Sequence, residues 1–334
     1  MVELRDNELV FSFPEIHAHA LLYVAFKRTL RIPDDDREYP LPPGLGDFPL
    51  RHVDDFGART PQHWSRRGGV ALPMYQSEAL WLHFRSPHEY PFAVKVAAGK
   101  INAVTGESWA EGLVPDPQDY LSIPAQPWLD GYCVRKSVIR QFVAMPLGSG
   151  YSVEEQVTGT AEHGGVQLLV HPLKKSAYQP RSQLVMKRWS AFDQATLFSP
   201  SEDLDMGLAA GGQMSQEIYE DTQEFNDWDL ERHGRCFVHL ANSLAWRAIT
   251  GQDPPTVPFT SAEYTRAGLP WFEYYADGEK ALQAGGILQT IRSVMQIGKA
   301  KGDVPLPENQ SVSPDNIVKL RAGLRPNEVR EGAF

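Results

Sequence analysis

Prolines and glycines divide the first 245 residues into short segments, and this division constrains the fold more than any other feature of the sequence. The whole chain has 26 Pro and 27 Gly. Many of the segments between them are rich in β-branched and aromatic residues, a composition typical of strands. Apolar and polar residues alternate most clearly at Phe92, Val94 and Val96, so Lys95 is expected on the opposite, outward face. We therefore predict short strands over 8–13, 21–32, 79–84, 92–97, 100–104, 137–145, 166–172, 215–220 and 235–243.

Helix signals are sparse before residue 250. Ser152 and Glu155 form a capping-box pattern, which predicts a short helix over 152–159. The Pro-rich segment 251–259 is a connector, and Thr260 with Glu263 repeats the capping-box pattern after it.

Two further helices are predicted near the C-terminus. Segment 279–298 has helical apolar spacing, and segment 313–323 begins with helix-start residues. The predicted fold is α+β and mostly β. It has a β-rich body over 1–250, sandwich or barrel-like, the connector at 251–259, and a helical C-terminal portion over 260–334 packed on the body.

The charge distribution excludes some classes of partner. The net charge is −10, and 11 acidic residues without any Lys or Arg lie between Trp189 and Glu231. An acidic chain with no basic stripe is a poor match for nucleic acid or for an anionic membrane surface. No apolar run has the length of a membrane span, and the two cysteines do not form a disulfide framework. We expect a soluble, cytoplasmic protein.

Two fragments resemble parts of phosphate-handling enzymes, but their context is wrong. Asp55-Phe56-Gly57 precedes Lys95, whereas in kinases the lysine strand comes before this triplet. The segment that ends at Lys100 fails as a Walker loop, because Ile101 stands where Ser or Thr must bind magnesium. Both fragments are interpreted as a turn and a strand.

A stronger candidate for anion or nucleotide binding is the turn formed by Gly148, Ser149, Gly150 and Ser152. A strand, a Gly-Ser-Gly turn and a helix N-terminus would direct backbone N–H groups toward one point. Glu154 and Glu155 at the start of the helix would repel a phosphate. A turn capped by Ser152 explains the same residues, and both interpretations stay open.

A metal site is the second candidate. His17 and His19 are two residues apart, so on a strand both imidazoles would face the same side, as two metal ligands require. A third ligand could come from Asp54 or Asp55, or from the neighbouring His52. The alternative is a pair of hydrogen-bonded or surface histidines without a metal.

Other chemistry-bearing residues fall short of a pattern. Asp227, Asp229 and Glu231 resemble the start of a calcium loop, but Arg232 takes the place of its glycine. Neither cysteine has a partner for nucleophilic catalysis, and Glu162 with His163 is explained by a turn before a strand. Trp128 and Trp271 each follow a proline and would suit exposed contact surfaces or a core under long loops.

Several stretches together resemble a family of uncharacterised bacterial and fungal proteins with no established activity. They include "PMYQSEALW", "AVKVAAGKINAVTGE", "QPWLDGYC" and "QFVAMPLGSGYSVEEQVTG", within about the first two-thirds of the chain. The resemblance implies no role for any residue.

The sequence therefore favours a non-enzymatic binding or assembly protein that forms homo-oligomers. One alternative is a metal-dependent enzyme using His17 and His19 with Asp54 or Asp55. The other is a small-anion or nucleotide binder at Gly148–Ser152.

Overall fold

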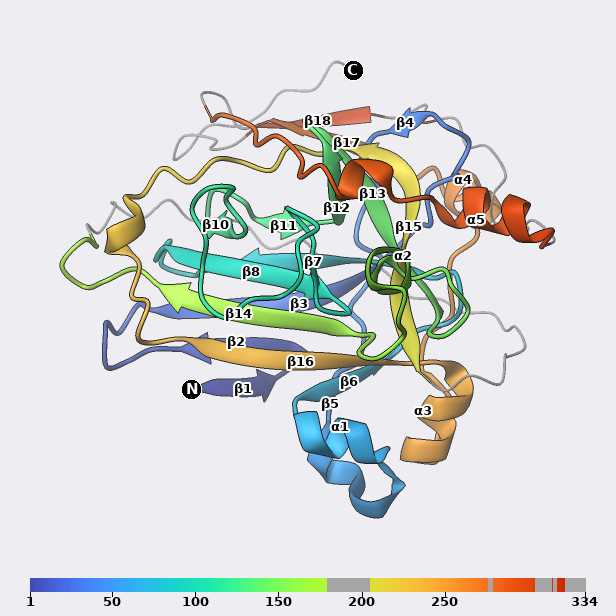
Figure 1. The fold of residues 1–334 in the computed structure, drawn as a ribbon, viewed down its shortest axis with the longest axis horizontal. Coiled ribbons are helices and arrows are strands. Elements are labelled where there is room, and N and C mark those ends of the chain that lie inside the picture. Colours follow the sequence, from blue (N-terminus) through green and yellow to red (C-terminus); the bar gives the residue numbers. More distant parts are fainter. Residues whose placement is uncertain (179–204, 276–278, 304–313, 315–316, 322–334) are drawn as a thin grey trace.

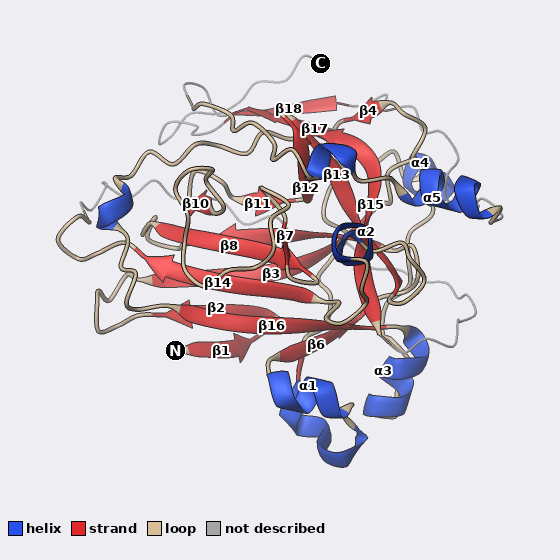
Figure 2. Cartoon of the chain, viewed as in Figure 1, coloured by secondary structure: helices blue, strands red, loops and turns tan. Residues whose placement is uncertain are grey.

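The computed structural model describes residues 1–178, 205–275, 279–303, 314 and 317–321. Its body consists of two large β-sheets that pack face to face, with short helices at the ends and around the rim (Figures 1 and 2). The fold is α+β and mostly β, as predicted, and the sheets form a sandwich rather than a closed barrel. None of the helices in the described ranges is both long and apolar enough to cross a membrane.

The first sheet has nine strands in the order β1-β2-β3-β7-β13-β15-β4, with β11 paired to β7 and β12 to β13. Neighbours are antiparallel except β4, which runs parallel to β15. The strands are β1 (Val2–Arg5), β2 (Glu8–Ser12), β3 (Leu21–Thr29), β4 (Glu38–Tyr39), β7 (Ala79–Arg85), β11 (Trp128–Leu129), β12 (Gly131–Arg135), β13 (Val138–Pro146) and β15 (Met206–Ser215).

The second sheet has seven strands in the order β10-β8-β14-β16-β6-β5, with β9 paired to β8. The strands are β5 (Arg51–His52), β6 (Val70–Pro73), β8 (Phe92–Ala98), β9 (Ile101–Asn102), β10 (Leu121–Ile123), β14 (Val166–Pro172) and β16 (Gly234–Ala241). Most neighbours are antiparallel, but β6 runs parallel to β16, and Val70 lies opposite Val238. The turn from β8 to β9 has positive φ at both Gly99 and Lys100, the geometry that matches the twist of a tight hairpin.

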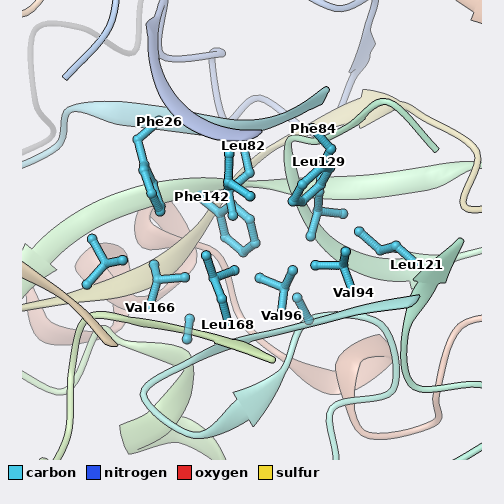
Figure 3. Packing of buried hydrophobic residues seen from close by; sticks show 14 of the residues in the cluster. Phe26, Leu82, Phe84, Val94, Val96, Leu121, Leu129, Phe142, Val166 and Leu168 are labelled. Atoms are coloured by element: carbon cyan, nitrogen blue, oxygen red, sulfur yellow. The ribbon is translucent and has the colours of Figure 1, made fainter. Parts of the chain in front are cut away.

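The main core lies between the two sheets. Figure 3 shows Phe26, Leu82 and Phe142 of the first sheet facing Val96 and Leu168 of the second. Val94 and Val96 face this core, so the alternation seen in the sequence at 92–96 marks the inner face of β8, as predicted. Burial of this apolar surface is the main source of stability for such a sandwich.

The helices are short and lie at the periphery. They are η1 (Val53–Arg59), α1 (Gln62–Arg67), α2 (Val153–Thr158), η2 (Phe225–Asp227), α3 (Ser243–Thr250), α4 (Ser261–Arg266), η3 (Leu288–Thr290) and α5 (Val294–Lys301). The capping boxes predicted at Ser152 and Thr260 are both present.

The C-terminal portion differs from the prediction in its details. The predicted helix over 279–298 is wrong for most of its length, because only η3 and the start of α5 are helical there. The predicted helix over 313–323 is also wrong where the structure describes it. Residues Ile317–Arg321 form β18, which pairs in parallel with β17 (Trp271–Tyr275). Pairing with a strand overrides the local helix signal of Ser-Pro.

Part of this C-terminal chain covers the outer face of the first sheet. Trp271 is 2% exposed and packs with Tyr39 and Tyr264 in a second apolar cluster. Trp128 is half-buried at the rim of this cluster. An exposed contact surface at Trp271 is therefore wrong, because the ring belongs to the core beneath this chain. The predicted strand over 215–220 is also wrong, since β15 ends at Ser215.

Lys95 lies on the outer face of β8, as predicted, but it is buried rather than exposed. Its side chain is 1% exposed under the loop 105–119, and the ammonium nitrogen lies 2.5 Å from a carboxylate oxygen of Asp119. It also donates to the carbonyl oxygens of Ala110, at 2.9 Å, and Gly112, at 2.8 Å. The loop thus covers the face of the sheet by binding one buried cation.

Candidate functional site

The turns at one end of the sandwich bring together five of the ten histidines. Figure 1 shows these segments at the left edge: the turn between β2 and β3, the start of β8, the end of β14, and η2 with the chain that leads into β16. The histidines they carry are His17, His19, His88, His171 and His233.

His17 and His19 lie in a turn rather than on a strand. The N–H groups of Ile16 and His17 both donate to the carbonyl of Phe13, and that of Ala20 donates to His17. The expected strand geometry is therefore wrong, but the turn still brings the two rings to 4.9 Å between centroids.

The surroundings of His17 are aromatic. Its ring stacks on Tyr90 at 5.6 Å and meets Tyr178 edge-on at 4.9 Å, while His19 stacks on His88 at 4.2 Å. Desolvation, with the nearby His19 and Lys175, lowers the pKa of His17, so its neutral form is favoured.

The neutral His17 ring is held in one tautomer. Its Nδ1 accepts a hydrogen bond from the backbone N–H of His19 at 3.0 Å. The ring proton must then be on Nε2, and a metal ion could bind Nε2 only by displacing it. His17 is therefore poorly suited as a metal ligand.

His171 and His233 form a second pair at the same end. β14 and β16 are antiparallel, with Val170 opposite Gly234, so the next residue of β14 meets the residue before β16. The two ring centroids are 5.3 Å apart. The N–H group of Asp229 also donates to the carbonyl of Pro172, which ties the turn after η2 to the end of β14.

An open cleft of about 510 Å³ lies between these turns. Its walls carry three cationic and three acidic side chains together with four uncharged residues. They are Lys174, Lys175, Arg232, Glu15, Asp229, Glu231, Ile16, Ser176, Asn226 and Leu230. The formal charge of the lining is therefore zero.

Some of these charges are already engaged by the protein. The Lys174 ammonium donates to the carbonyl of Asn226 at 2.6 Å, and the Arg232 guanidinium binds Asp229 at 3.0 Å. Asp229 also accepts from the backbone N–H groups of Glu231 and Arg232, and these bonds lower its pKa although burial opposes them. Lys175 and Glu231 are exposed, and the described residues offer no salt-bridge partner to either of them.

The structure does not bring the predicted acidic ligands to these histidines. Asp54 and Asp55 are exposed in the first turn of η1, which Figure 1 shows with α1 beneath the sheets and away from the β2–β3 turn. Within the described ranges, no group of three His, Cys, Asp or Glu side chains is placed to hold a metal ion.

The Gly148–Ser152 turn is occupied by the chain itself. The Glu155 carboxylate accepts from the N–H of Gly150 at 2.6 Å and of Ser152 at 3.1 Å, and from the Ser152 hydroxyl at 2.6 Å. The Lys301 ammonium binds the carbonyl of Ser149. An incoming anion would have to displace a carboxylate that is already in place.

Glu154, in the first turn of α2, binds the turn that contains His163. Its carboxylate is 2% exposed and accepts from the N–H groups of His163, at 2.9 Å, and Gly164, at 2.8 Å. One oxygen also lies 2.9 Å from Nδ1 of His163. His163 is thus held by a structural carboxylate, and the structure places Glu162 as a neighbour in the same turn rather than as a partner.

The two cysteines and the acidic residues 227–231 have roles in the fold that explain their positions. Burial raises the pKa of both Cys133 and Cys236 to about 12, so neither is a ready nucleophile. Asp229 closes its own turn, and Asp227 lies in η2. The part of the acidic stretch before residue 205, with Asp193, Glu202 and Asp203, lies outside the described residues.

The sequence indicated His17 and His19, but it did not indicate the cleft or the His171–His233 pair. The pair depends on the register of β14 with β16, which joins residues far apart in the chain. The available signal was that His171 lies near the end of the predicted strand 166–172 and His233 lies just before the predicted strand 235–243.

Comparison with known proteins gives no match: no family model, no curated protein and no solved structure matches the chain. The resemblance noted in the sequence therefore stays a prediction, and function is to be inferred from the site itself.

Proposed function

We propose that this chain is a soluble, cytoplasmic binding protein without catalytic activity, and that it holds a small polar molecule in the charged cleft. The observation that carries the proposal is the cleft of about 510 Å³ lined by charges of both signs. That volume is within the range of small-molecule sites, roughly 300–1,000 Å³.

The charges of the lining favour a ligand that itself carries both signs. The lining has three cations and three acids, so a purely anionic or purely cationic molecule would meet as many like charges as opposite ones. A zwitterion such as a free amino acid can pair its carboxylate with Lys175 and its ammonium group with Glu231, two exposed groups of the lining without a salt-bridge partner among the described residues.

The absence of a catalytic arrangement is consistent with binding. Within the described residues, the cleft wall has no cysteine and no histidine, and its Asp229 carboxylate is fixed by Arg232 and the turn. A general base must reach the substrate and change protonation during the reaction, and neither remaining acid is held by a partner that would position it.

Free amino acids and dipeptides are expected to raise the melting temperature, and inorganic phosphate and simple amines are not. Ligand at about 100 times its dissociation constant adds about 2.7 kcal/mol to the free energy of unfolding. Lys175→Ala and Glu231→Ala should each weaken binding about tenfold, the loss of one charged hydrogen bond. Thermal unfolding and titration calorimetry measure both effects.

Lys299→Ala is a matched control, because it removes an exposed lysine from α5, which Figure 1 shows at the opposite end of the molecule. Equal affinity in this variant and in Lys175→Ala, or a flat melting temperature with all the zwitterions, would contradict the proposal.

We further propose that the protein forms homo-oligomers through the edge of the first sheet. β1 is the end strand of that sheet, and in the described part of the chain it pairs only with β2. Its outer N–H and C=O groups are therefore available to a strand of another copy. Native mass spectrometry should give the mass of two or more chains, and Leu4→Pro should reduce it to the mass of one chain. A monomer for the parent protein at micromolar concentration would refute this assembly.

A further inference from the structure

His171 has a buried ring nitrogen without a partner. The residue is 1% exposed, and its Nδ1 lies 2.9 Å from the carbonyl oxygen of Asp229. A carbonyl oxygen only accepts, so Nδ1 carries the proton and donates it. The lone pair is therefore on Nε2, and no described residue makes a hydrogen bond with that atom.

A buried acceptor without a partner costs about 1–3 kcal/mol. This unpartnered nitrogen lies near the cleft, because Asp229, whose carbonyl accepts from His171, also lines the cleft wall. The arrangement is also the one that metal-binding histidines have, with the second ring nitrogen donating to a backbone carbonyl. The Nε2 atom of His171 is thus prepared to receive a metal ion.

The distance to His233 fits two ligands of one ion. A metal–nitrogen bond of about 2.1 Å places the imidazole centroid about 3.2 Å from the ion. Two imidazoles at a tetrahedral angle then have centroids about 5.2 Å apart. The observed centroid distance between His171 and His233 is 5.3 Å.

We propose that His171 and His233 bind one divalent first-row transition-metal ion on the outer face of the second sheet, between the ends of β14 and β16. Imidazole nitrogen suits Cu²⁺, Ni²⁺ and Zn²⁺, and the affinity should be highest for Cu²⁺. The protein supplies two ligands, and water fills the other positions. This inference does not depend on the ligand proposed for the cleft.

The neighbouring charges allow a cation at this place. The Lys95 ammonium disfavours a positive charge at His171, but the Asp119 carboxylate pairs with this ammonium and offsets its charge. The Asp229 carboxylate is bound by Arg232 and is not counted as a ligand.

The other histidine pair provides the control. His17 has the opposite tautomer, with its proton on Nε2, because its Nδ1 accepts from the His19 N–H. His17→Gln/His19→Gln removes two histidines from the same end of the molecule without touching His171 or His233.

The experiment is titration of the full chain, carrying no histidine tag, with Cu²⁺ and with Zn²⁺. Calorimetry should give one ion per chain, and the Cu²⁺ electron paramagnetic resonance spectrum should show coupling to two nitrogens. His233→Gln should weaken binding at least tenfold and remove one nitrogen from the spectrum, because loss of a ligand costs at least as much as loss of a supporting residue, whose effect is about 10–100-fold. His17→Gln/His19→Gln should bind as the parent protein does.

His233 is exposed, so His233→Gln is expected to fold. This variant therefore tests the site even if His171→Gln, at a buried position, is less stable than the parent protein. Unchanged Cu²⁺ affinity in His233→Gln overturns the proposal, as does loss of binding in the His17/His19 variant. Absence of binding in the parent protein also overturns it and assigns the Nε2 of His171 to an ordered water.

Discussion

Replacement of Lys95 by methionine is expected to lower the free energy of unfolding by about 3–5 kcal/mol, the cost of removing one partner of a buried ion pair. The substitution leaves the Asp119 carboxylate buried without its cation. It also removes the donor to the carbonyls of Ala110 and Gly112, which fix the covering loop 105–119. Urea unfolding followed by tryptophan fluorescence measures the change.

The double variant Lys95→Met/Asp119→Asn separates the charge effect from lost packing. Because the second substitution removes the stranded charge, the double variant should be more stable than the sum of the two single changes predicts. Lys136→Met, at an exposed position in the turn between β12 and β13, is the control and should change stability by less than about 0.5 kcal/mol. Additive single and double effects, or a loss at Lys95 no larger than at Lys136, would show that the pair is not coupled.

Replacement of Asp130 by asparagine is expected to stabilise the protein at pH 8 by up to about 4 kcal/mol and to have little effect near pH 4. Burial raises the pKa of the Asp130 carboxyl from 3.8 to about 7, against a hydrogen bond from Gln216 that lowers it. Between pH 4 and 7 the folded chain keeps this proton while the unfolded chain loses it. The stability of the parent protein therefore falls as the pH rises through this window.

Asparagine cannot ionise, and its side-chain oxygen can still accept from Gln216 Nε2, which lies 2.8 Å from the carboxylate. The difference in unfolding free energy between Asp130→Asn and the parent protein should therefore grow from pH 4 to 7 and stay constant above that range. Chemical unfolding at several pH values measures it.

The measured quantity is the difference between the variant and the parent protein, because other buried groups also make the unfolding free energy depend on pH. Burial raises the pKa of Glu78 to about 7, which adds to the fall in stability over the same window. Burial lowers the pKa of His83 to about 4 and of His239 to about 3, so these rings cost stability as the pH falls below 6.5. The comparison with the parent protein cancels all three. Asp6→Asn, at an exposed turn, is the control and should change stability by less than about 0.5 kcal/mol. A difference for Asp130→Asn that stays the same from pH 4 to 8 would contradict the prediction.

The sequence predicted features that depend on neighbours along the chain. The alternation of Phe92, Val94 and Val96 marked the inner face of β8, and the Ser152 capping box formed as its spacing indicates. Both follow from the geometry of one strand or one helical turn, so no distant residue was needed.

Features that depend on distant partners were missed. Ser313 and Pro314 are typical of a helix start, but the residues that follow, 317–321, form the strand β18 because they pair with β17. Lys95 was correctly assigned to the outer face, but its burial depends on the irregular loop 105–119, whose path has no periodicity to read. The meeting of His171 with His233 likewise follows only from strand register.

The order of strands in the second sheet has a consequence for the synthesis of the protein on the ribosome. In the described part of the chain, β5 and β6 are joined to the rest of that sheet only through the pairing of β6 with β16 (Gly234–Ala241). The N-terminal part is made first, so β5 and β6, with η1 and α1 attached to them, must wait for residues near 241 to leave the exit tunnel. Until then a strand edge and the apolar side chains of Val70 and Leu72 are open to other nascent chains. A ribosome that stalls before residue 234 would therefore present an incomplete sandwich to the chaperones of the cell.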